Sequence, residues 1–402
     1  MELGDISTLK TSGGDSILLL VLDGLGGLPR ETGGPTELEA ARTPNFDALA
    51  QAGDLGLHLP VGRGITPGSG PGHLSLFGYD PLQYRIGRGV LEALGVEFDL
   101  QPGDVAIRGN LCSVDDRGLI VDRRAGRIST EDAIPVCAAL DRIEVTGARV
   151  FVQCVKEHRV LIVVRPDEAS GASIADTDPG RAGFEPRPVC AIDPDSEPAA
   201  LAIREWMEGI PGVFADGDQA NMVLLRGFSQ LPDWPGFPDV FGLRSLAIAA
   251  YPMYRGVARL VGMDAISVPE GPEHLVVALE TEGAERDFAF LHVKAPDKAG
   301  EDGDFDRKVA AIEEVDAVVP DLLAAFPGVW LVTGDHSTPA TMKAHSWHAV
   351  PFLISGGHGR GESAGAEFGE RACHHGSLGL LRGCDLMSLA MARAGRLSKF
   401  GA

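Results

Sequence analysis

The pattern of hydrophobic positions predicts buried strands near both ends of the chain. Short, mainly apolar runs cover residues 17–22, 288–293, 329–333 and 350–355. Runs of this length without regular polar alternation are typical of strands that are buried on both faces of a parallel sheet. Because helical segments are expected between them, the pattern predicts an α/β fold with a mostly parallel sheet.

The helices are predicted from their start signals and their composition. Thr43 and Pro44 are residue types favoured at a helix N-cap and in the first turn, so one helix is expected to begin at Pro44. Tyr254 lies at helical spacing from Val257 and is expected in the core. Residues 60–72 are too rich in Gly and Pro for regular structure. Further helices are predicted over residues 89–94, 245–262 and 306–326, and from His73 and Ser377.

The middle of the chain differs from both ends in its pattern of predicted elements and in its proline content. It contains short β-like runs at residues 150–155 and 160–164, many turn pairs and a high density of proline. We therefore predict an inserted, smaller α+β domain over residues 101–244. Residues 15–100 and 245–402 then form a discontinuous catalytic domain around it.

Composition and charge narrow the possible partners. The chain has 402 residues, with 44% hydrophobic and 23% charged, as in ordinary soluble globular proteins. It carries 35 Lys and Arg against 57 Asp and Glu, a formal net charge of −22, which disfavours general binding to nucleic acid or to an anionic membrane. Six cysteines without a CxxC pair, and the lack of a signal peptide or of a long apolar segment, predict a cytoplasmic protein.

Acidic residues follow three of the predicted strands. Asp23 ends the first apolar run, Asp297 follows the second, and the pair Asp335-His336 follows the third. Ligands of open α/β sheets bind beyond the carboxyl ends of the strands, so these side chains are expected to meet in one crevice, with His345 nearby. Carboxylates gathered in this way require cations, and the pattern therefore predicts bound divalent metal.

Ser69 is the candidate nucleophile. It lies in the glycine-rich segment Gly68–His73, where the backbone can approach a ligand closely. No apolar strand runs directly into this serine, so the strand–turn–helix elbow of hydrolases does not fit, and activation by metal is the better account. A loop whose serine only caps a turn is the alternative.

Several motifs together resemble a known family. They occupy residues 23–27, 43–49, 67–69, 73–81, 87–89, 103–110, 122–127, 176–179, 333–339 and 350–351. The chain resembles the archaeal-type, cofactor-independent phosphoglycerate mutases of the alkaline phosphatase superfamily. The resemblance implies an alkaline-phosphatase-like sheet with helices on both faces. It also implies an isomerase of glycolysis and gluconeogenesis that interconverts 3-phosphoglycerate and 2-phosphoglycerate without 2,3-bisphosphoglycerate.

The resemblance also implies a centre with two divalent metal ions. One ion would be held by Asp23, Ser69, Asp335 and His336. The other would be held by Asp297, His345 and the residue four positions after Asp297, which is usually His in the family but is Glu301 here. A carboxylate at that position favours Mn²⁺ or Mg²⁺ over Zn²⁺, with Co²⁺ also compatible. The alternative is that Glu301 lies on a solvated loop and binds no metal.

The implied chemistry is phosphoryl transfer through a phosphoserine at Ser69. The serine takes the phosphoryl group from the substrate, the glycerate reorients, and its other hydroxyl takes the group back. Asp122 is a candidate to carry the proton between the two hydroxyls, although a structural ion pair would explain it equally well. Candidates for binding the substrate's carboxylate and phosphate, each also explicable as a surface residue, are Arg108, Arg123, Arg124, Arg127, Arg226 and Arg255.

Other functions remain open from the sequence alone. A related phosphotransferase could pass phosphate to a different alcohol, such as homoserine, and a plain phosphatase or phosphodiesterase would release inorganic phosphate. A degenerate relative that only binds ligands is the non-enzyme alternative, to which Glu301 lends some support. The expected partner is a small phosphorylated hydroxy acid, and a homo-oligomer is possible.

Overall fold

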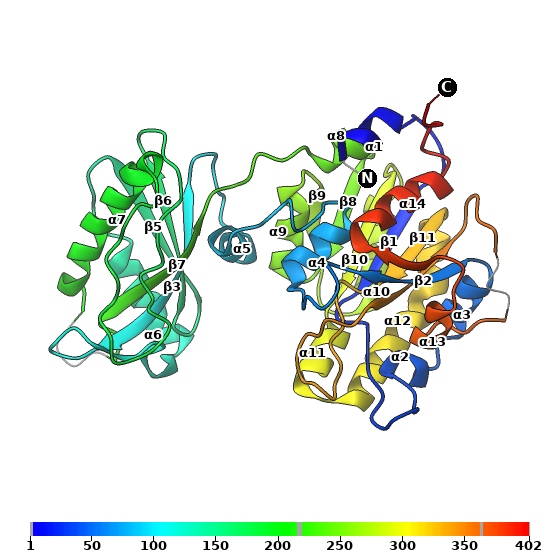
Figure 1. Ribbon diagram of the computed structural model, residues 1–402, viewed down its shortest axis with the longest axis horizontal. Helices are drawn as coiled ribbons and strands as arrows, with labels where there is room; N and C mark the ends of the chain where they lie inside the picture. The colour runs from blue at the N-terminus through cyan, green and yellow to red at the C-terminus, as the bar shows by residue number, and fades with distance from the viewer. Residues whose placement is uncertain (1–2, 215–218, 362–364, 402) are drawn as a thin grey trace. The chain divides into compact units, whose positions relative to one another are not determined.

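The computed structural model describes residues 3–214, 219–361 and 365–401 and divides the chain into two compact units (Figure 1). The first unit comprises residues 1–85 and 234–402, and the second comprises residues 86–233.

Both boundaries between the units lie earlier in the chain than the sequence suggested. The second unit includes α5 (Arg88–Gly95). The backbone of Gly89 in this helix packs so closely on β3 (Val105–Val114) that an added Cβ would lie 1.9 Å from Ala106 O. The first unit gains α8 (Phe237–Phe241), whose Phe237 ring packs 4.8 Å from that of Phe288.

The first unit is built on an eight-stranded sheet. Its strand order is β13-β2-β12-β11-β1-β10-β8-β9, in which β12 is antiparallel to both neighbours and the other pairs are parallel. The strands are β1 (Ile17–Leu22), β2 (Asp54–Leu59), β8 (Ser245–Ala249), β9 (Asp264–Ser267), β10 (Phe288–Val293), β11 (Val329–Thr333), β12 (Val350–Ser355) and β13 (Gly379–Arg382).

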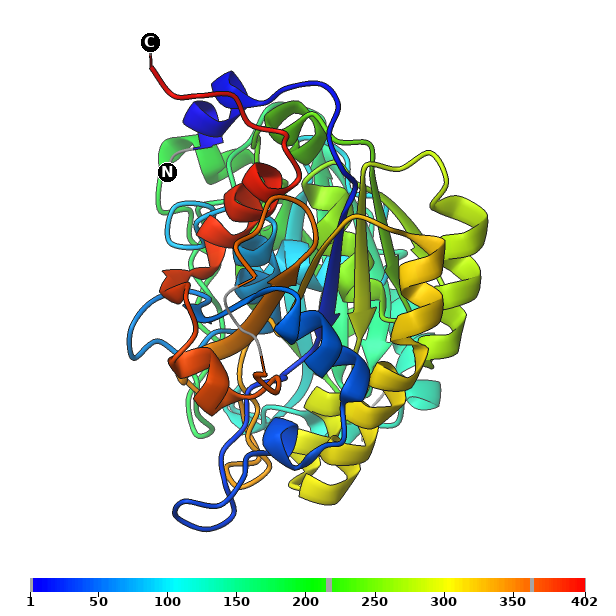
Figure 2. The ribbon, with the colours of Figure 1, turned by 90° about the vertical axis from the view of Figure 1, so that its right-hand side faces the viewer.

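Helices cover both faces of this sheet (Figure 2). Leu18 and Leu20 of β1 join the core that includes Ile312 of α12 (Phe305–Ala325), whereas Phe290 of β10 packs on the opposite face against Phe77, with 5.0 Å between ring centroids. The helices are α1 (Leu3–Leu9), α2 (Glu37–Ala40), α3 (Pro44–Gln51), α4 (Ser69–Leu76), α8, α9 (Pro252–Leu260), α10 (Pro272–Glu282), α11 (Ala295–Asp302), α12 (Phe305–Ala325), α13 (Glu370–His374) and α14 (Leu386–Arg393). None of these helices is long and apolar enough to cross a membrane.

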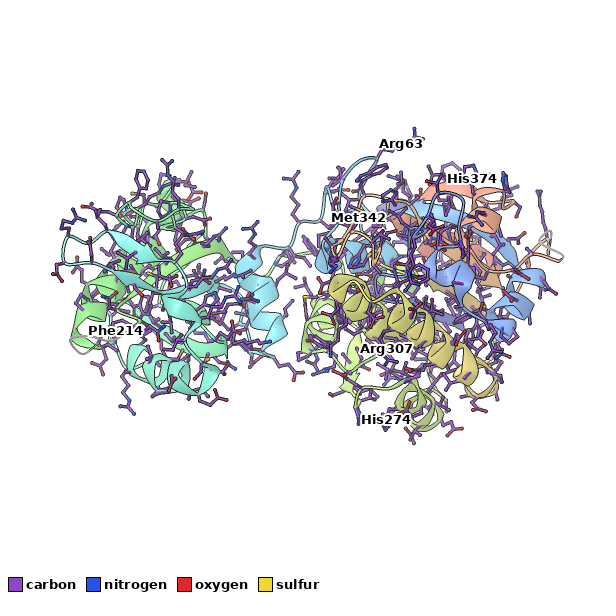
Figure 3. The ribbon with its side chains drawn as sticks, turned by 90° about the horizontal axis from the view of Figure 1, so that it is seen from below. Arg63, Phe214, His274, Arg307, Met342 and His374 are labelled. Atoms are coloured by element: carbon purple, nitrogen blue, oxygen red, sulfur yellow. The ribbon has the colours of Figure 1, made fainter. Side chains whose placement is uncertain are left out.

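The second unit is a smaller antiparallel sheet with its own helices. The order β4-β3-β6-β5 is extended by β7, which pairs with β3. Trp206 of α7 is fully buried in the core of this unit, and Phe214 packs against the same core (Figure 3). The elements are β3 (Val105–Val114), β4 (Ile120–Asp122), β5 (Ala148–Lys156), β6 (Arg159–Pro166), β7 (Met222–Ser229), α5, α6 (Thr130–Leu140) and α7 (Glu197–Gly209).

The α/β fold with a mostly parallel sheet is confirmed, and so are the four strands predicted from apolar runs. Three local predictions were wrong. Residues 245–262 form a strand, a turn and a helix instead of one helix. Strand β13 and a separate helix α14 replace the helix expected from Ser377. Helix α4 begins at Ser69 instead of His73, so part of the glycine-rich segment is helical.

Candidate active site

Three adjacent parallel strands bring the acidic residues together. β11, β1 and β10 are neighbours in the sheet, so their carboxyl ends lie along one edge. Asp23 follows β1 directly, Asp335 follows β11, and Asp297 lies in the first turn of α11 after β10. All three carboxylates are fully buried. The convergence expected from the sequence is therefore present in the fold.

The first candidate metal group consists of Asp23, Asp335 and His336, whose ligand atoms lie within 4.8 Å of one another. His336 Nε2 is 3.4 Å from Asp23 Oδ1 and 3.2 Å from Asp335 Oδ2. Ser69 Oγ lies 3.2 Å from the same nitrogen. His336 Nε2 thus lies within 3.4 Å of an oxygen of each of the other three residues predicted for one metal ion.

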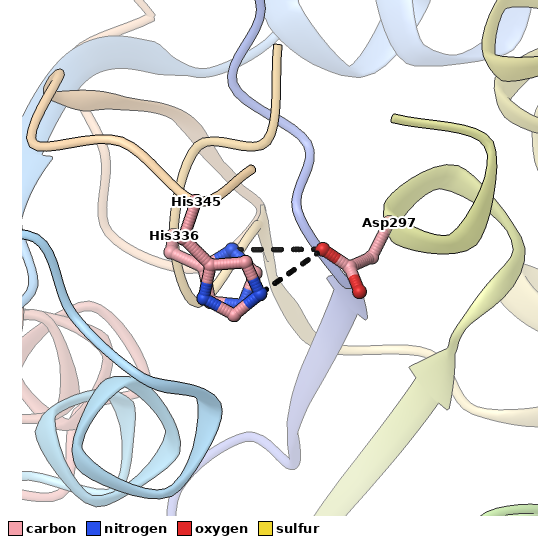
Figure 4. A group of neighbouring side chains, drawn as sticks. All are labelled: Asp297, His336 and His345. Atoms are coloured by element: carbon pink, nitrogen blue, oxygen red, sulfur yellow. Dashed lines mark ion pairs between the residues drawn. The ribbon is translucent and has the colours of Figure 1, made fainter. Parts of the chain in front are cut away.

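The second candidate metal group consists of Asp297, His336 and His345 (Figure 4). His345 Nε2 is 3.6 Å from Asp297 Oδ1, and the rings of His336 and His345 stack at 3.7 Å between centroids. Glu301 lies beside this group, with Oε1 3.6 Å from His345 Nε2, but its side chain is 54% exposed. The two groups share His336, so they are parts of one continuous site.

The donor atoms fit divalent metal ions. Among the described residues, Asp23 Oδ1 and Asp335 Oδ2 are buried without a hydrogen-bond partner, which is costly for a carboxylate unless a cation is bound. Lys294 Nζ lies 3.1 Å from Asp23 Oδ2 and 2.5 Å from Asp297 Oδ2 and neutralises only part of this charge. Burial raises the pKa of Asp23, but the hydrogen bond with His292 and the charges of Lys294 and His336 outweigh burial and hold that pKa well below its usual value. Asp23 is therefore ionised and ready to accept a metal.

Helix α4 places Ser69 at the site. Gly68 is the N-cap, so Ser69 is the first helical residue, beside amides that have no partner within the helix. A Cβ at Gly72 would lie 2.4 Å from the carbonyl oxygen of Asp335. Gly72 therefore lets this helix pack directly against the loop that carries Asp335 and His336.

Several residues around the site were not predicted from the sequence. His73 Nδ1 lies 2.8 Å from Ser69 O and 3.2 Å from Asp335 Oδ2, and the latter carboxylate raises the pKa of His73 although burial opposes this. His292 Nε2 lies 3.0 Å from Asp23 Oδ2, and its ring stacks on Tyr254 at 3.7 Å. The available signal was His292 itself, a polar residue inside an apolar strand. Tyr254 is buried as expected, but its hydroxyl also accepts a hydrogen bond from Lys294 Nζ at 2.9 Å.

Comparison with known proteins identifies the family. The family model described as 2,3-bisphosphoglycerate-independent phosphoglycerate mutase matches residues 50–219. A Thermus thermophilus protein named as a probable 2,3-bisphosphoglycerate-independent phosphoglycerate mutase is 49% identical over 393 residues, covering 96% of each chain. The chain belongs to this family. An Aquifex aeolicus relative with the same name is 46% identical over 407 residues, covering 99% of each chain.

Solved structures agree with this assignment to the mutase family. The cofactor-independent phosphoglycerate mutase from Thermoplasma acidophilum superposes with a TM-score of 0.75 at 29% identity, covering 95% of this chain and 100% of that one. A protein from Pyrococcus horikoshii superposes with a TM-score of 0.81 at 30% identity, covering 97% and 100%. The resemblance to the archaeal-type, cofactor-independent mutases is thereby confirmed.

The predicted arginines of this mutase family member fall into two groups. Arg255 is buried in the first unit, where Nη1 donates to the carbonyl oxygens of Ala249 and Ala250 at the end of β8. The other predicted arginines all belong to the second unit: Arg108, Arg123, Arg124, Arg127 and Arg226.

Within the second unit, Arg108 and Arg226 are cross-strand partners on β3 and β7. Arg123 binds Asp178 through two hydrogen bonds of 3.0 and 2.6 Å, and Arg226 lies 3.5 Å from the same carboxylate. Burial lowers the pKa of Arg108, and the charges of Arg159 and Arg226 lower it further against the opposing effect of Glu92. These guanidinium groups therefore form a locally cationic surface on an acidic protein.

Asp122, the predicted proton carrier, lies in the same unit. Oδ1 accepts a hydrogen bond from the Arg124 amide at 2.8 Å, and Oδ2 accepts one from the Gly126 amide at 2.7 Å. The carboxylate thus caps the turn that carries Arg124 and Arg127. These two hydrogen bonds give Asp122 a structural role in stabilising the turn that carries the arginines.

Proposed function

We propose that the protein is a metal-dependent phosphoglycerate mutase that interconverts 3-phosphoglycerate and 2-phosphoglycerate through a phosphoserine at Ser69, without 2,3-bisphosphoglycerate. The observation that carries this proposal is the position of Ser69 Oγ, 3.2 Å from His336 Nε2 inside a group of buried carboxylates. Membership of the mutase family supports it. A cytoplasmic location is part of the proposal, because charged three-carbon acids do not cross bilayers unaided.

We propose the metal ligands that the resemblance to the family implies. Asp23, Ser69, Asp335 and His336 would hold one divalent ion, and Asp297, His345 and Glu301 a second, with Mn²⁺ as the proposed metal because oxygen donors dominate the set. When bound, such ions neutralise phosphoryl oxygens and lower the pKa of a serine hydroxyl.

In the forward direction Ser69 Oγ forms a bond to phosphorus while the bond between phosphorus and the C3 oxygen of the substrate breaks. The product pair is phosphoserine and glycerate. The first turn of α4 supports the phosphoserine, since unpartnered amides at a helix N-terminus favour an anion at that position. The C2 oxygen of glycerate then attacks the same phosphorus, which regenerates Ser69.

The second unit is proposed to bind the substrate's anionic groups. The candidate residues are arginines, whose planar guanidinium groups can donate paired hydrogen bonds to carboxylate and phosphate oxygens. They are Arg108, Arg123, Arg124, Arg127 and Arg226. We propose that Asp122 carries the proton between the C2 and C3 hydroxyls while the glycerate reorients. Both carboxylate oxygens of Asp122 accept hydrogen bonds from backbone amides, and these bonds fix the orientation of the carboxylate for this task.

The test is a coupled enolase assay with 3-phosphoglycerate and no added bisphosphoglycerate, performed with and without Mn²⁺. We expect turnover that requires the metal. Ser69→Ala should abolish it, because the phosphoryl carrier is lost, whereas removing one hydroxyl from a small, partly buried side chain costs little stability. Retention of more than a few per cent of activity in Ser69→Ala would refute the covalent route. Release of inorganic phosphate in place of 2-phosphoglycerate would assign a phosphatase.

A further inference from the structure

Two loops carry the ligands of the first candidate metal group. The first ligand loop is residues 23–28, which follow β1, and the second ligand loop is residues 335–340, which follow β11. They touch through their backbones, because the amide of Thr338 donates to the carbonyl oxygens of Gly24 and Gly26 at 3.2 and 3.0 Å. Any displacement of one loop relative to the other changes the spacing of Asp23 and Asp335.

A buried lysine joins these two loops from behind. Lys308 projects from α12 and has no exposed surface. Its Nζ donates to Gly26 O at 3.0 Å on the first ligand loop and to Thr338 O at 2.9 Å on the second. One ammonium group therefore holds a carbonyl from each loop.

A buried glutamate makes the complementary connection. Glu37, on α2, is also fully buried. Its Oε1 accepts a hydrogen bond from the amide of Ala340 at 2.7 Å, and its Oε2 accepts one from the amide of Leu28 at 3.0 Å. Lys308 Nζ lies 4.0 Å from Glu37 Oε1. The carboxylate thus binds amides of the same two loops whose carbonyls bind the ammonium.

The joined loops are linked to the metal ligands through Thr338. Its Oγ1 donates to Asp297 Oδ1 at 2.6 Å and lies 2.9 Å from His336 Nδ1. The space is tight, since a Cβ at Gly24 would lie 2.6 Å from the same Oγ1. The backbone position of Thr338, which Lys308 fixes, therefore sets the orientation of one ligand from each candidate metal group.

Stability alone does not explain a charged pair at this place. Removing two charges from water is expensive, and well-packed apolar side chains often serve stability equally well. An ion pair does supply what apolar groups cannot, namely four directed hydrogen bonds to backbone groups of two loops.

We propose that Lys308 and Glu37 form a clamp that positions the metal ligands. The clamp comprises these two side chains and their four bonds to the ligand loops. The inference rests on the proposed metal-dependent function, and it makes both residues positioning residues, because neither touches a ligand side chain directly.

The test measures Mn²⁺ binding by titration calorimetry on metal-stripped, full-length protein. We compare wild type with Lys308→Met and with the nearly isosteric Glu37→Gln, and we expect each variant to bind Mn²⁺ about 10–100-fold more weakly. Arg393→Met is the matched control. Arg393 is also a buried cation, paired with Asp54 and donating to Gly356 O, but it touches neither ligand loop. It should lose stability without a comparable loss of Mn²⁺ affinity.

The outcomes separate the clamp from the proposed function. If wild type binds no Mn²⁺, the metal-dependent function fails and the clamp fails with it. If wild type binds Mn²⁺ and a folded clamp variant binds it equally well, only the clamp is refuted.

Hydrogen exchange on metal-free wild type decides the matter even if the variants do not fold. The clamp requires the amides of Leu28 and Ala340 to be protected before metal arrives. Exchange of these amides at the rate of an unstructured peptide would overturn it.

Discussion

At the scale of single residues, the site combines strong negative charge with complete burial. Asp23, Asp297 and Asp335 are each shielded from solvent, and Lys294 is placed between two of them. Burial lowers the pKa of His292 despite its hydrogen bond with Asp23, so this imidazole is held neutral at neutral pH. The neutral ring orients Asp23 without competing with a metal for its charge.

Glu301 is the residue at which the chain departs from its family's usual pattern. Its carboxylate lies 3.6 Å from His345 Nε2 at the solvent edge of the second candidate metal group. We expect Glu301→His to retain activity and to shift metal preference toward Zn²⁺ or Co²⁺, because imidazole is the softer ligand. Glu301→Ala should lower metal affinity and activity by about 10–100-fold. Both are measured by assays across a metal series.

The neighbouring Asp302→Ala is the matched control for Glu301, since both side chains are exposed on the same helix. It should behave as wild type. A loss confined to Asp302→Ala would assign the ligand to that residue instead, and wild-type behaviour of all the variants would leave Glu301 without a role in metal binding.

Glu370 gives the fold a dependence on pH. Burial raises its pKa to about 7, although hydrogen bonds with Thr36 and the Gly27 amide oppose this. The folded protein therefore keeps this proton up to about pH 7, whereas the unfolded chain loses it near 4.5, so the contribution of Glu370 to stability falls as pH rises between these values. The penalty above pH 7 is about 3 kcal/mol.

Glu370→Gln removes this titration. Urea unfolding at pH 5 and pH 8 should show that the variant gains free energy of unfolding relative to wild type at the higher pH. Glu280→Gln, on the exposed face of α10, is the control and should not change the pH dependence. An identical pH dependence of wild type and Glu370→Gln would contradict the prediction.

The convergence of Asp23, Asp297 and Asp335 could be predicted because each lies at or shortly after the end of an apolar run, where chain topology alone brings the strand ends together. His292, Lys294 and Tyr254 could not be assigned in this way. Their roles depend on contacts between β10 and α9, which are distant from Asp23 in sequence. The substrate-binding role of Arg255 stays a prediction, and its hydrogen bonds to two backbone carbonyls could not be predicted from the sequence.

At the scale of elements, close packing of α4 on the second ligand loop determines where Ser69 lies. Gly72→Ala would place a Cβ 2.4 Å from Asp335 O, and backbone on both sides leaves little room to adjust. We expect the helix to shift, the free energy of unfolding to fall by about 1–3 kcal/mol, and mutase activity to fall at least tenfold. Urea unfolding and the enolase-coupled assay measure the two effects.

Gly95→Ala is the control for Gly72→Ala, because it adds the same methyl group to a helix where nothing lies within 4 Å of the new Cβ. Its stability and activity should match or exceed those of wild type. Full activity of Gly72→Ala would mean that the position of Ser69 does not depend on this contact.

Strands were predicted more successfully than helices for a physical reason. β1, β10, β11 and β12 are buried along their whole length, which gives mainly apolar runs. Residues 245–249 are buried in the same way, but their alanines are also good helix formers, so composition suggested one helix. The missed signal was Pro252, which marks the first turn of α9.

At the scale of the whole molecule, each unit has its own core. The core of the second unit is built from residues of that unit alone, and Trp206 at its centre donates from Nε1 to Leu140 O at 3.2 Å. We therefore expect residues 86–233 to fold as an isolated fragment. Its single tryptophan should emit as a buried residue and report one cooperative urea transition. Solvent-exposed emission in the absence of urea would refute an independent second unit.

The strand order of the first unit has a consequence for protein synthesis. β1 pairs with β10 and β11, and β2 pairs with β12 and β13, so neither early strand has a neighbour until synthesis has reached the last third of the chain. The whole second unit is translated and can fold during that interval. During that time the backbone N–H and C=O groups along both edges of the apolar segment Ile17–Leu22 have no partner strand. Unpaired strands of this kind can pair wrongly with strands of other chains. We therefore expect the nascent chain to be more prone to wrong pairing between chains than the folded protein.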